Sequence, residues 1–178
     1  MTADGARPDR ARRVTAEAGQ EFLAAATRAA LACSRTSRFP PGITVAQAAL
    51  ESNWGQSQLA RDAHNYFGIK AHGDHARVSY PTLEHNHGRD LRVSAEFARY
   101  DSMEECFADR DRLIATAQCY ARARACGGDP EDFARALAAH WATDPSYADK
   151  LLRLYRANRL DTLDCRSPDH PITGSPVS

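Results

Sequence analysis

The chain has 178 residues, of which 43% are hydrophobic and 26% charged, and this composition is typical of a globular protein. Its 23 basic and 23 acidic residues give a formal net charge of zero, so no basic excess indicates a nucleic-acid-binding protein. No apolar run is long enough to cross a membrane, which predicts that the chain does not insert into one. The length suits one domain with a sizeable core.

The two ends of the chain differ in composition from its middle. Residues 1–13 carry charge and proline but lack the apolar stretch of a secretory signal, so we expect a flexible arm there. Thr15 is then expected to cap a first helix. Residues 165–178 are rich in proline and serine, which predicts a disordered tail. A single domain is therefore expected over residues 14–164.

The stretch TVAQAALESNWG combines a helical pattern with a carboxylic acid at its end. Its apolar residues recur at helical spacing and predict one buried stripe, with Glu51 at the border of that stripe. Gly55 is expected to end the helix, because glycine tolerates the left-handed conformation of a helix end. An apolar wall that includes Trp54 would raise the pKa of Glu51, and a raised pKa is what a general acid requires.

The middle of the chain changes from helical to alternating periodicity. Apolar and polar side chains alternate from Leu91 to Phe97, which is typical of a half-buried strand. Residues 77–80 are expected to form the opposing strand, and residues 85–88 the turn. This pattern predicts a small β-hairpin lobe.

Several helix starts are marked by capping residues. Ser102 and Glu105 have the spacing of a capping box. Asp129 and Asp144 are each followed by proline and are expected to cap two further helices. Together with the hairpin, these elements predict an α+β fold that is predominantly helical.

Histidines crowd the region before and within the hairpin. They are His72, His75, His85 and His87, together with Asp74. Their spacing does not match the helical HExxH arrangement or a cysteine-containing zinc site. We therefore predict no metal site and no cofactor.

Four separated blocks of sequence resemble a known family. The blocks are AQAALESNWG, NYFGIKA, LRVSAEFARYDS and WATDPSYADKLLRL, and they occur in this order between about residues 39 and 160. They are similar to the bacterial glucosaminidases of glycoside hydrolase family 73, which include the flagellar peptidoglycan hydrolase and many autolysins. The resemblance implies a lysozyme-like fold that cleaves the bond between N-acetylglucosamine and N-acetylmuramic acid in peptidoglycan.

The resemblance also implies site residues. Glu51 matches the catalytic acid of the family, and Glu84 matches a second acidic residue just before the hairpin turn, with a solvated loop carboxylate as the alternative. The expected substrate-binding residues are Asn53, Trp54, Tyr66, Trp141 and Tyr147. Two of these positions depart from the family, since Asn53 replaces the usual glycine and Trp141 the usual tyrosine. Tyr147 suits the core as well as the substrate-binding cleft.

The chemistry leaves several alternatives open. Glu84 is one candidate to activate water, and the acetamido oxygen of the substrate is an alternative nucleophile, so inversion and assisted retention both remain. A lytic transglycosylase or muramidase is a rival reading, because lysozyme-like folds with one glutamate support these reactions too. A catalytically inert wall-binding domain is a rival from another class.

The expected place of action is the cell wall, in the periplasm or outside the cell. Peptidoglycan strands are the expected partner. The lack of a cleavable signal favours delivery by lysis or by a secretion machine such as type VI, with loss of a leader as the alternative. An injected antibacterial effector would need a cognate periplasmic immunity protein in the producing cell.

Overall fold

The computed structural model describes residues 7–86, 89–126 and 128–164, except for the side chains of residues 7–16 and 82–93. In chain order the elements are α1 (Arg7–Ser37), α2 (Pro41–Ser52), α3 (Gln58–Ala63), β1 (Arg77–Asn86), β2 (Arg89–Ala98), α4 (Met103–Thr116), the short 3-10 helix η1 (Gln118–Tyr120), α5 (Ala121–Arg124), α6 (Pro130–Trp141), α7 (Tyr147–Ala157) and α8 (Asp161–Asp164). The predicted class, α+β and predominantly helical with a small hairpin, is confirmed.

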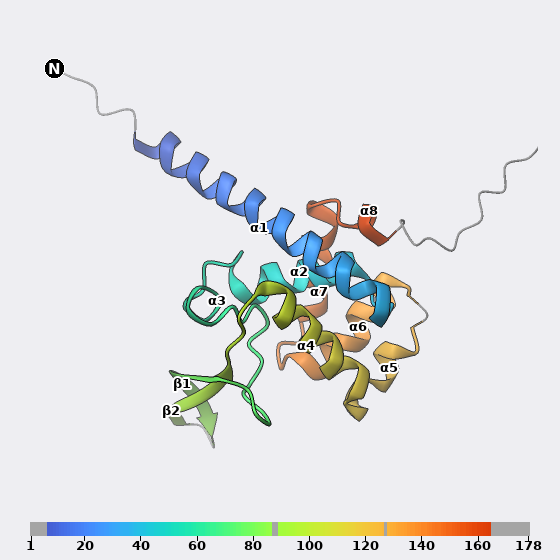
Figure 1. Ribbon diagram of the computed structural model, residues 1–178. Coiled ribbons are helices and arrows are strands. Elements are labelled where there is room, and N and C mark those ends of the chain that lie inside the picture. Colours follow the sequence, from blue (N-terminus) through green and yellow to red (C-terminus); the bar gives the residue numbers. More distant parts are fainter. Residues whose placement is uncertain (1–6, 87–88, 127, 165–178) are drawn as a thin grey trace, which may run out of the picture.

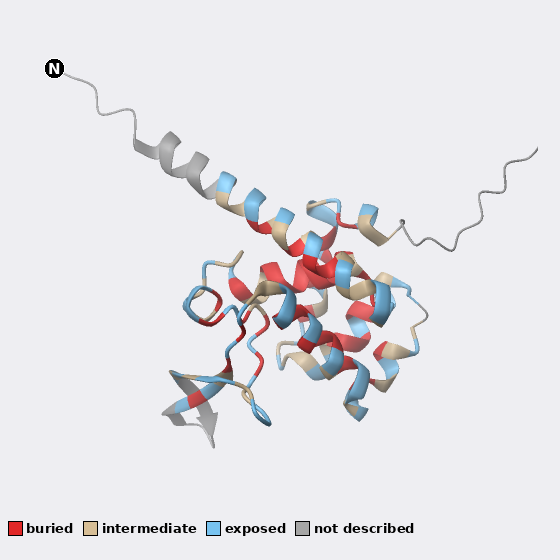
Figure 2. Ribbon diagram, in the orientation of Figure 1, coloured by how far each residue is buried: buried red, intermediate tan, exposed pale blue. Residues whose placement is uncertain are grey.

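Helix α2 lies at the centre of the helical body and contacts α1, α6, α7 and α8 (Figures 1 and 2). Every residue from Gly42 to Ala49 is buried, and so is Ser52. Glycine and alanine occupy many of these positions, and small side chains let the neighbouring helices approach closely. The sequence analysis expected one buried stripe along this helix, but the structure buries the helix on all sides over these residues. Apart from its first residue, Pro41, α2 becomes half-buried at Leu50 and Glu51, near its C-terminus.

The N-terminus of α2 is capped by a residue from the far end of the domain. Its own N-cap residue is Pro40, which makes no side-chain capping bond. The backbone N–H of Gly42 instead donates to Oδ1 of Asp164 at 2.9 Å, and the hydroxyl of Tyr155 donates to Oδ2 at 2.7 Å. A Cβ at Gly42 would lie 2.4 Å from the carbonyl oxygen of Leu160, so only glycine fits here.

Helix α1 is longer than the sequence analysis predicted. It begins at Arg7 and not at Thr15, so residues 7–13 of the expected arm are helical, while residues 1–6 lie outside the described part. Its N-terminal half extends beyond the body of the domain (Figure 1). Its C-terminal half packs on α2 and α4 through Phe22 and a set of buried alanines. The predicted tail over residues 165–178 also lies outside the described residues.

The two strands form a lobe at one end of the molecule (Figure 1). They pair antiparallel from Arg77 opposite Ala98 to Asn86 opposite Arg89, so the first strand is longer than the predicted 77–80. Two backbone bonds join β2 to the segment before the hairpin, from Ala98 N–H to the carbonyl of Ile69 and from Ala71 N–H to the carbonyl of Glu96. The centre of the predicted turn, residues 87–88, lies outside the described residues.

Of the four predicted helix caps, those at Ser102 and Asp129 are confirmed. The Ser102 hydroxyl accepts from the Glu105 N–H at 3.1 Å, and Asp129 accepts from the Asp132 N–H at 2.8 Å. Helix α7, however, begins at Tyr147 and not at Pro145, with Ser146 at the capping position. Asp144 closes the turn before this helix by accepting from the backbone and hydroxyl of Ser146.

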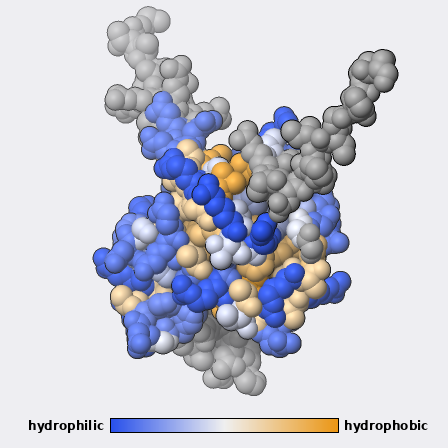
Figure 3. Space-filling model, turned by 45° about the vertical axis from the view of Figure 1, so that its right-hand side comes forward, coloured by the Kyte–Doolittle hydropathy of each residue, from blue (hydrophilic) through white to orange (hydrophobic). Residues whose placement is uncertain are grey.

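The face seen in Figure 3 is largely hydrophilic, with apolar side chains gathered in small patches. Within residues 7–86, 89–126 and 128–164, no helix has the length and apolar character needed to span a bilayer.

Candidate active site

Glu51 lies in the last turn of α2, where this helix reaches the surface of the body. Its side chain is half-buried, and its Oε1 accepts a hydrogen bond of 2.5 Å from the hydroxyl of Tyr147. Burial raises the pKa of Glu51, while hydrogen bonding from Tyr147 and Trp141 acts in the opposite direction by favouring the carboxylate. Burial has the larger effect, so Glu51 holds its proton to a higher pH than an ordinary glutamate.

Tyr147, which donates to Glu51, and Trp141, which favours its carboxylate form, come from the ends of neighbouring helices. Trp141 is the last residue of α6 and is half-buried, whereas Tyr147 is the first residue of α7 and is only 6% exposed. The ring of Tyr147 therefore belongs to the core, and its hydroxyl donates a hydrogen bond to Glu51. Burial, followed by the neighbouring Glu51 charge, raises the pKa of this phenol, so Tyr147 keeps its proton as a donor.

The backbone reverses direction immediately after α2. Asn53, Trp54 and Gly55 have φ angles of 49°, 58° and 74°, a left-handed conformation that only glycine and, less readily, asparagine adopt at low cost. This geometry explains why asparagine can stand at position 53, where glycine is usual in the family, and Asn53 itself is exposed. Gly55 also lies against Phe22, since a Cβ at Gly55 would be 2.8 Å from that ring.

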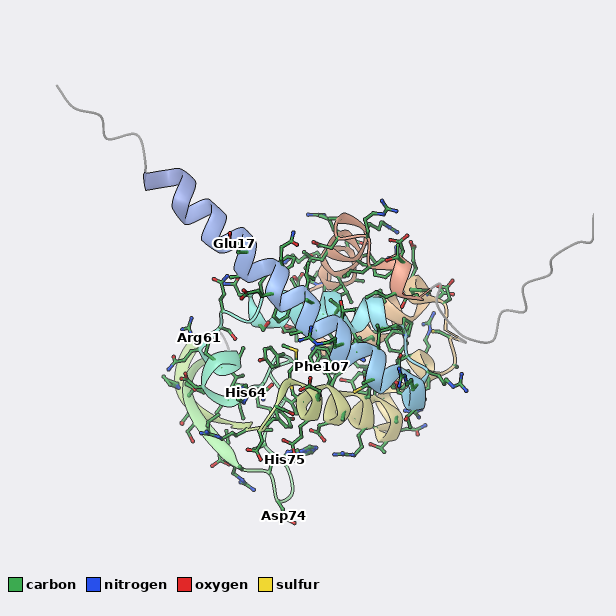
Figure 4. The ribbon with its side chains drawn as sticks, turned by 45° about the horizontal axis from the view of Figure 1, so that its top comes forward. Glu17, Arg61, His64, Asp74, His75 and Phe107 are labelled. Atoms are coloured by element: carbon green, nitrogen blue, oxygen red, sulfur yellow. The ribbon has the colours of Figure 1, made fainter. Side chains whose placement is uncertain are left out.

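A row of aromatic rings runs from this turn across the body. Trp54 packs edge-on against Phe22, with ring centroids 6.3 Å apart, and Phe22 packs against Tyr66 at 6.1 Å. Tyr66 in turn contacts Phe107 on α4 at 6.3 Å, a ring that faces into the body (Figure 4). The predicted binding residues Trp54 and Tyr66 are thus half-buried neighbours within one row.

Asn65 is a structural residue of the site region that the sequence analysis did not single out. It is 1% exposed, and its amide donates to the carbonyls of Ile69 and Ala98 at 2.9 and 2.8 Å. Its Oδ1 accepts from the N–H groups of Phe67 and Ile69. The side chain of Asn65 therefore fixes the NYFG loop and joins it to β2. The signal in the sequence was a polar residue at the start of an otherwise aromatic loop.

The backbone of Glu84 lies in β1, paired with Leu91. Its side chain lies outside the described residues, so the role predicted for Glu84 is untested.

The histidine region brings His72, His75 and Asp109 together, with potential ligand atoms within 4.8 Å of one another. The two Nδ1 atoms of the histidines lie 3.0 Å apart and share a hydrogen bond. Asp109 is 3% exposed, and it accepts from the hydroxyl of Tyr100 at 2.8 Å and from Arg112 at 2.6 Å. Because both oxygens of Asp109 have donors, we interpret the group as a tether of this loop to α4, with Asp74 at the loop tip (Figure 4).

Comparison with known proteins places this geometry in a family. Residues 27–160 match the glucosaminidase family model, described as mannosyl-glycoprotein endo-beta-N-acetylglucosaminidase. The exo-glucosaminidase LytG of Bacillus subtilis is 34% identical over 133 residues, which are 72% of this chain and 47% of LytG. The peptidoglycan hydrolase FlgJ of Escherichia coli K12 is 37% identical over 140 residues, which are 75% of this chain and 44% of FlgJ. The chain thus spans less than half the length of these relatives.

Solved structures agree with this relationship. The catalytic domain of the Listeria monocytogenes autolysin Auto superposes with a TM-score of 0.75 at 26% identity, covering 92% of this chain and 99% of that one. A C-terminally truncated glycoside hydrolase domain of Salmonella typhimurium FlgJ superposes with a TM-score of 0.66 at 34% identity, covering 79% of this chain and 97% of that one. The lysozyme-like fold expected from the resemblance is confirmed. The chain belongs to the glucosaminidase family, glycoside hydrolase family 73.

Proposed function

We propose that this protein is an endo-β-N-acetylglucosaminidase that cleaves peptidoglycan between N-acetylglucosamine and N-acetylmuramic acid, with Glu51 as the general acid. The observation that carries the proposal is the half-buried Glu51 with a raised pKa at the end of the central helix. A carboxylic acid whose pKa is raised holds its proton to a higher pH and can protonate the leaving oxygen of a glycosidic bond.

The surroundings of Glu51 suit proton donation. Tyr147 donates to Oε1, so the proton that Glu51 delivers is carried on Oε2. As the proton leaves, negative charge develops on the carboxylate, and the donors from Tyr147 and Trp141 stabilise that charge. We propose that the indole N–H of Trp141 donates to this carboxylate as the charge develops, in place of the hydroxyl that the family's usual tyrosine would supply.

Glu84 is proposed as the second carboxylate, which activates water. If it does so, Glu84→Gln removes most of the activity and the wild type inverts the configuration at the anomeric carbon. If the acetamido oxygen of the substrate attacks instead, Glu84→Gln keeps substantial activity and the product retains the configuration. NMR of the first-formed product distinguishes the two.

The test of the function is digestion of purified peptidoglycan, followed by reduction and mass spectrometry of the new ends. We expect reducing N-acetylglucosamine from the wild type, and a loss of about 10²–10⁴-fold in rate for Glu51→Gln, the range for a general acid. Glu17→Gln is the matched control, since Glu17 is exposed on α1 away from the site (Figure 4). A wild type that leaves accessible peptidoglycan intact would contradict the proposal and favour a wall-binding domain.

Two relatives suggest alternative functions. One relative from Lactococcus lactis, 35% identical over 131 residues, is a probable N-acetylmuramidase, and LytG is an exo-glucosaminidase. Reducing muramic acid would identify a muramidase, and anhydro-muramyl ends a lytic transglycosylase. Release of terminal sugars without shortening of the strands would identify exo-cleavage.

Action on the wall places the protein in the periplasm or outside the cell, and delivery by a secretion machine or by lysis is part of the proposal. A structure of a type VI effector–immunity complex from Pseudomonas protegens superposes with a TM-score of 0.57 at 20% identity, which supports the shared fold alone. The effector role is tested by directing the chain to the periplasm of a sensitive cell. Lysis that a neighbouring gene product prevents would support an immunity partner, and growth without lysis would contradict the effector role.

A further inference from the structure

A buried arginine on α4 contacts the N-terminal half and the middle of α2, at Thr44 and Gln47. Arg110 on α4 is 0% exposed and pairs with the neighbouring Asp111 at 2.7 Å. The guanidinium also donates to the hydroxyl of Thr44 at 2.9 Å and lies 5.6 Å from the centre of the Phe67 ring. A buried charge is costly unless it is fully paired, so each of these contacts narrows the positions that Arg110 can take.

Arg110 fixes the orientation of a glutamine on α2. Its Nε and Nη2 atoms both donate to Oε1 of Gln47, at 3.0 and 2.8 Å. A guanidinium has only donors, so the oxygen of the amide must face Arg110 and the NH₂ group must face away from it. The amide of Gln47, which is 0% exposed, therefore has one allowed orientation.

The NH₂ group of Gln47 has no hydrogen-bond partner among the described residues, which leaves a buried donor in need of an acceptor. Gln47 lies four residues before Glu51 on α2, so the two side chains share one face of this helix. The buried hydroxyl of Tyr147 bonds to Glu51 on that face and is therefore the candidate acceptor for the NH₂ group. The lowering effect of Gln47 on the pKa of this phenol, against the stronger effect of burial, agrees with that position.

The orientation that Arg110 imposes on Gln47 also decides which way the hydroxyl of Tyr147 donates. A tyrosine hydroxyl has one proton, and an oxygen that faces an N–H group accepts from it. The proton of Tyr147 is then free for Glu51, whose Oε1 lies 2.5 Å away. With a bond from Gln47 to Tyr147, every donor in the series from Arg110 through Gln47 and Tyr147 points toward Glu51.

We propose that Arg110 and Gln47 are positioning residues that fix the direction of this series, so that Tyr147 always donates to Oε1 of Glu51 and the transferable proton stays on Oε2. This proposal rests on the proposed function of Glu51 as the acid. Neither Arg110 nor Gln47 touches the substrate in it. They act through Tyr147 by excluding the arrangement in which the phenol turns its proton away from the acid.

The other titratable groups around the series are few among the described residues. Those that face it are Cys33 from α1, Glu51 from α2, Arg110 and Asp111 from α4, and Tyr147 from α7. Burial raises the pKa of Cys33 to about 11, so this thiol is uncharged near neutral pH. Apart from Glu51, the buried charges that face the series are therefore those of the paired Arg110 and Asp111.

Gln47→Glu is the sharpest variant, because it keeps the shape of the side chain and its bonds to Arg110 but replaces the donor by an acceptor. A glutamate beside Arg110 stays ionised and accepts the proton of Tyr147, so Glu51 loses its donor. We expect a roughly tenfold rise in the proton affinity of Glu51, as for loss of one charge-assisted hydrogen bond. Gln20→Glu is the matched control, since Gln20 is exposed on α1.

The measurement is an NMR titration of the carboxyl carbon of Glu51 in ¹³C-glutamate-labelled protein, with the signal assigned by its absence in Glu51→Gln. Gln47→Glu also adds a negative charge, so the titration is repeated in a Tyr147→Phe background. If Gln47 acts through Tyr147, most of the shift disappears in that background. A shift that persists undiminished there, or a Gln47→Glu titration equal to that of Gln20→Glu, would overturn the proposal.

The titration does not depend on hydrolysis, so the two proposals can fail separately. If the wild type does not cleave peptidoglycan but the titration behaves as expected, the proposed function fails and the positioning role stands. If the wild type cleaves, we also expect the basic limb of the pH–rate profile in Gln47→Glu to move to higher pH with the titration. A profile that stays in place would again contradict the positioning role.

Discussion

The helical body around α2 and the hairpin lobe hold their side chains by different means. In the body, buried rings and a buried polar series surround the helix that carries Glu51. In the lobe, the described ion pair joins exposed groups, Arg77 and Glu96, whose side chains are 48% and 54% exposed, and the ring of Phe97 is only half-buried. Exposed ion pairs contribute only about 0.2–1 kcal/mol each, whereas removing a buried ring costs about 3–5 kcal/mol.

This difference bears on the two carboxylates of the proposed mechanism. The position of Glu51 is coupled to the stability of the whole fold, because α2 cannot shift without disturbing the core. The position of Glu84 depends on a lobe that the described residues tie to the body through a few bonds. We therefore expect changes in the body to alter stability and acid chemistry together, and changes in the lobe to alter activity with little effect on stability.

The largest effect is expected from Phe107→Ala. Phe107 is fully buried on α4 and packs against Tyr66 and Phe67, so its loss should lower the free energy of unfolding by about 3–5 kcal/mol. Phe97→Ala in β2 is the matched change in the lobe, where the ring is half-buried, and should cost about 1 kcal/mol or less. Urea unfolding measures both, and equal costs would remove the contrast between body and lobe.

The next effect concerns the start of α2. In Gly42→Ala the new methyl group would lie 2.4 Å from a backbone oxygen of Leu160, and we expect a loss of about 1–3 kcal/mol from overpacking. Gly19→Ala makes the same change in α1, where nothing lies within 4 Å, and should stabilise the protein by about 0.5–1 kcal/mol. Thermal unfolding should give opposite signs for the two variants. Loss of stability in both would show that the close approach at Gly42 is not the cause.

A smaller effect is expected from the distant cap of α2. Asp164→Ala removes the acceptor for the N–H of Gly42 and for the hydroxyl of Tyr155, at a cost of about 1 kcal/mol, the usual value for an N-cap. Asp161→Ala, at an exposed position on the same short helix, is the control and should be nearly neutral. Chemical denaturation of the two variants tests whether the end of the domain stabilises the helix of the acid.

The smallest effect is expected from Tyr80→Phe. It removes the bond of 3.0 Å between the hydroxyl of Tyr80 in β1 and Asp62 on α3, both near the surface. We expect a loss of about 0.5 kcal/mol or less in global stability, together with faster amide hydrogen exchange in β1 and β2. A drop in global stability as large as that of Phe107→Ala would mean that the lobe belongs to the same cooperative unit as the body.

Local features of the fold could be predicted from the sequence because their signals are local. The caps at Ser102 and Asp129 depend on residues three positions away, and the structure contains both. The start of α1 is an exception, because Thr15 has the residue type of an N-cap while the helix begins eight residues earlier, at Arg7. The better signal was Pro8 in the first turn, followed by alanine and arginine, which favour helix.

The environment of the acid could not be predicted, because it is built from distant parts of the chain. The hydroxyl bonded to Glu51 comes from Tyr147, 96 residues away, and sequence patterns left this tyrosine open between core and cleft. Arg110 was missed for a different reason. Arginine is almost never fully buried, so a periodic pattern assigns it to the surface unless its partners are known.

The central claim is that Glu51 is the general acid and that the hydrogen bond from Tyr147 lowers its pKa. The pH dependence of kcat/KM in Tyr147→Phe tests this claim most directly. The hydroxyl favours the carboxylate form, so its removal should raise the pKa of Glu51 and keep the acid protonated to higher pH. The account predicts that the basic limb of the profile moves to higher pH. Tyr155→Phe, which removes another buried hydroxyl from α7, should leave the limb in place. A limb that stays in place or moves to lower pH in Tyr147→Phe would contradict the account.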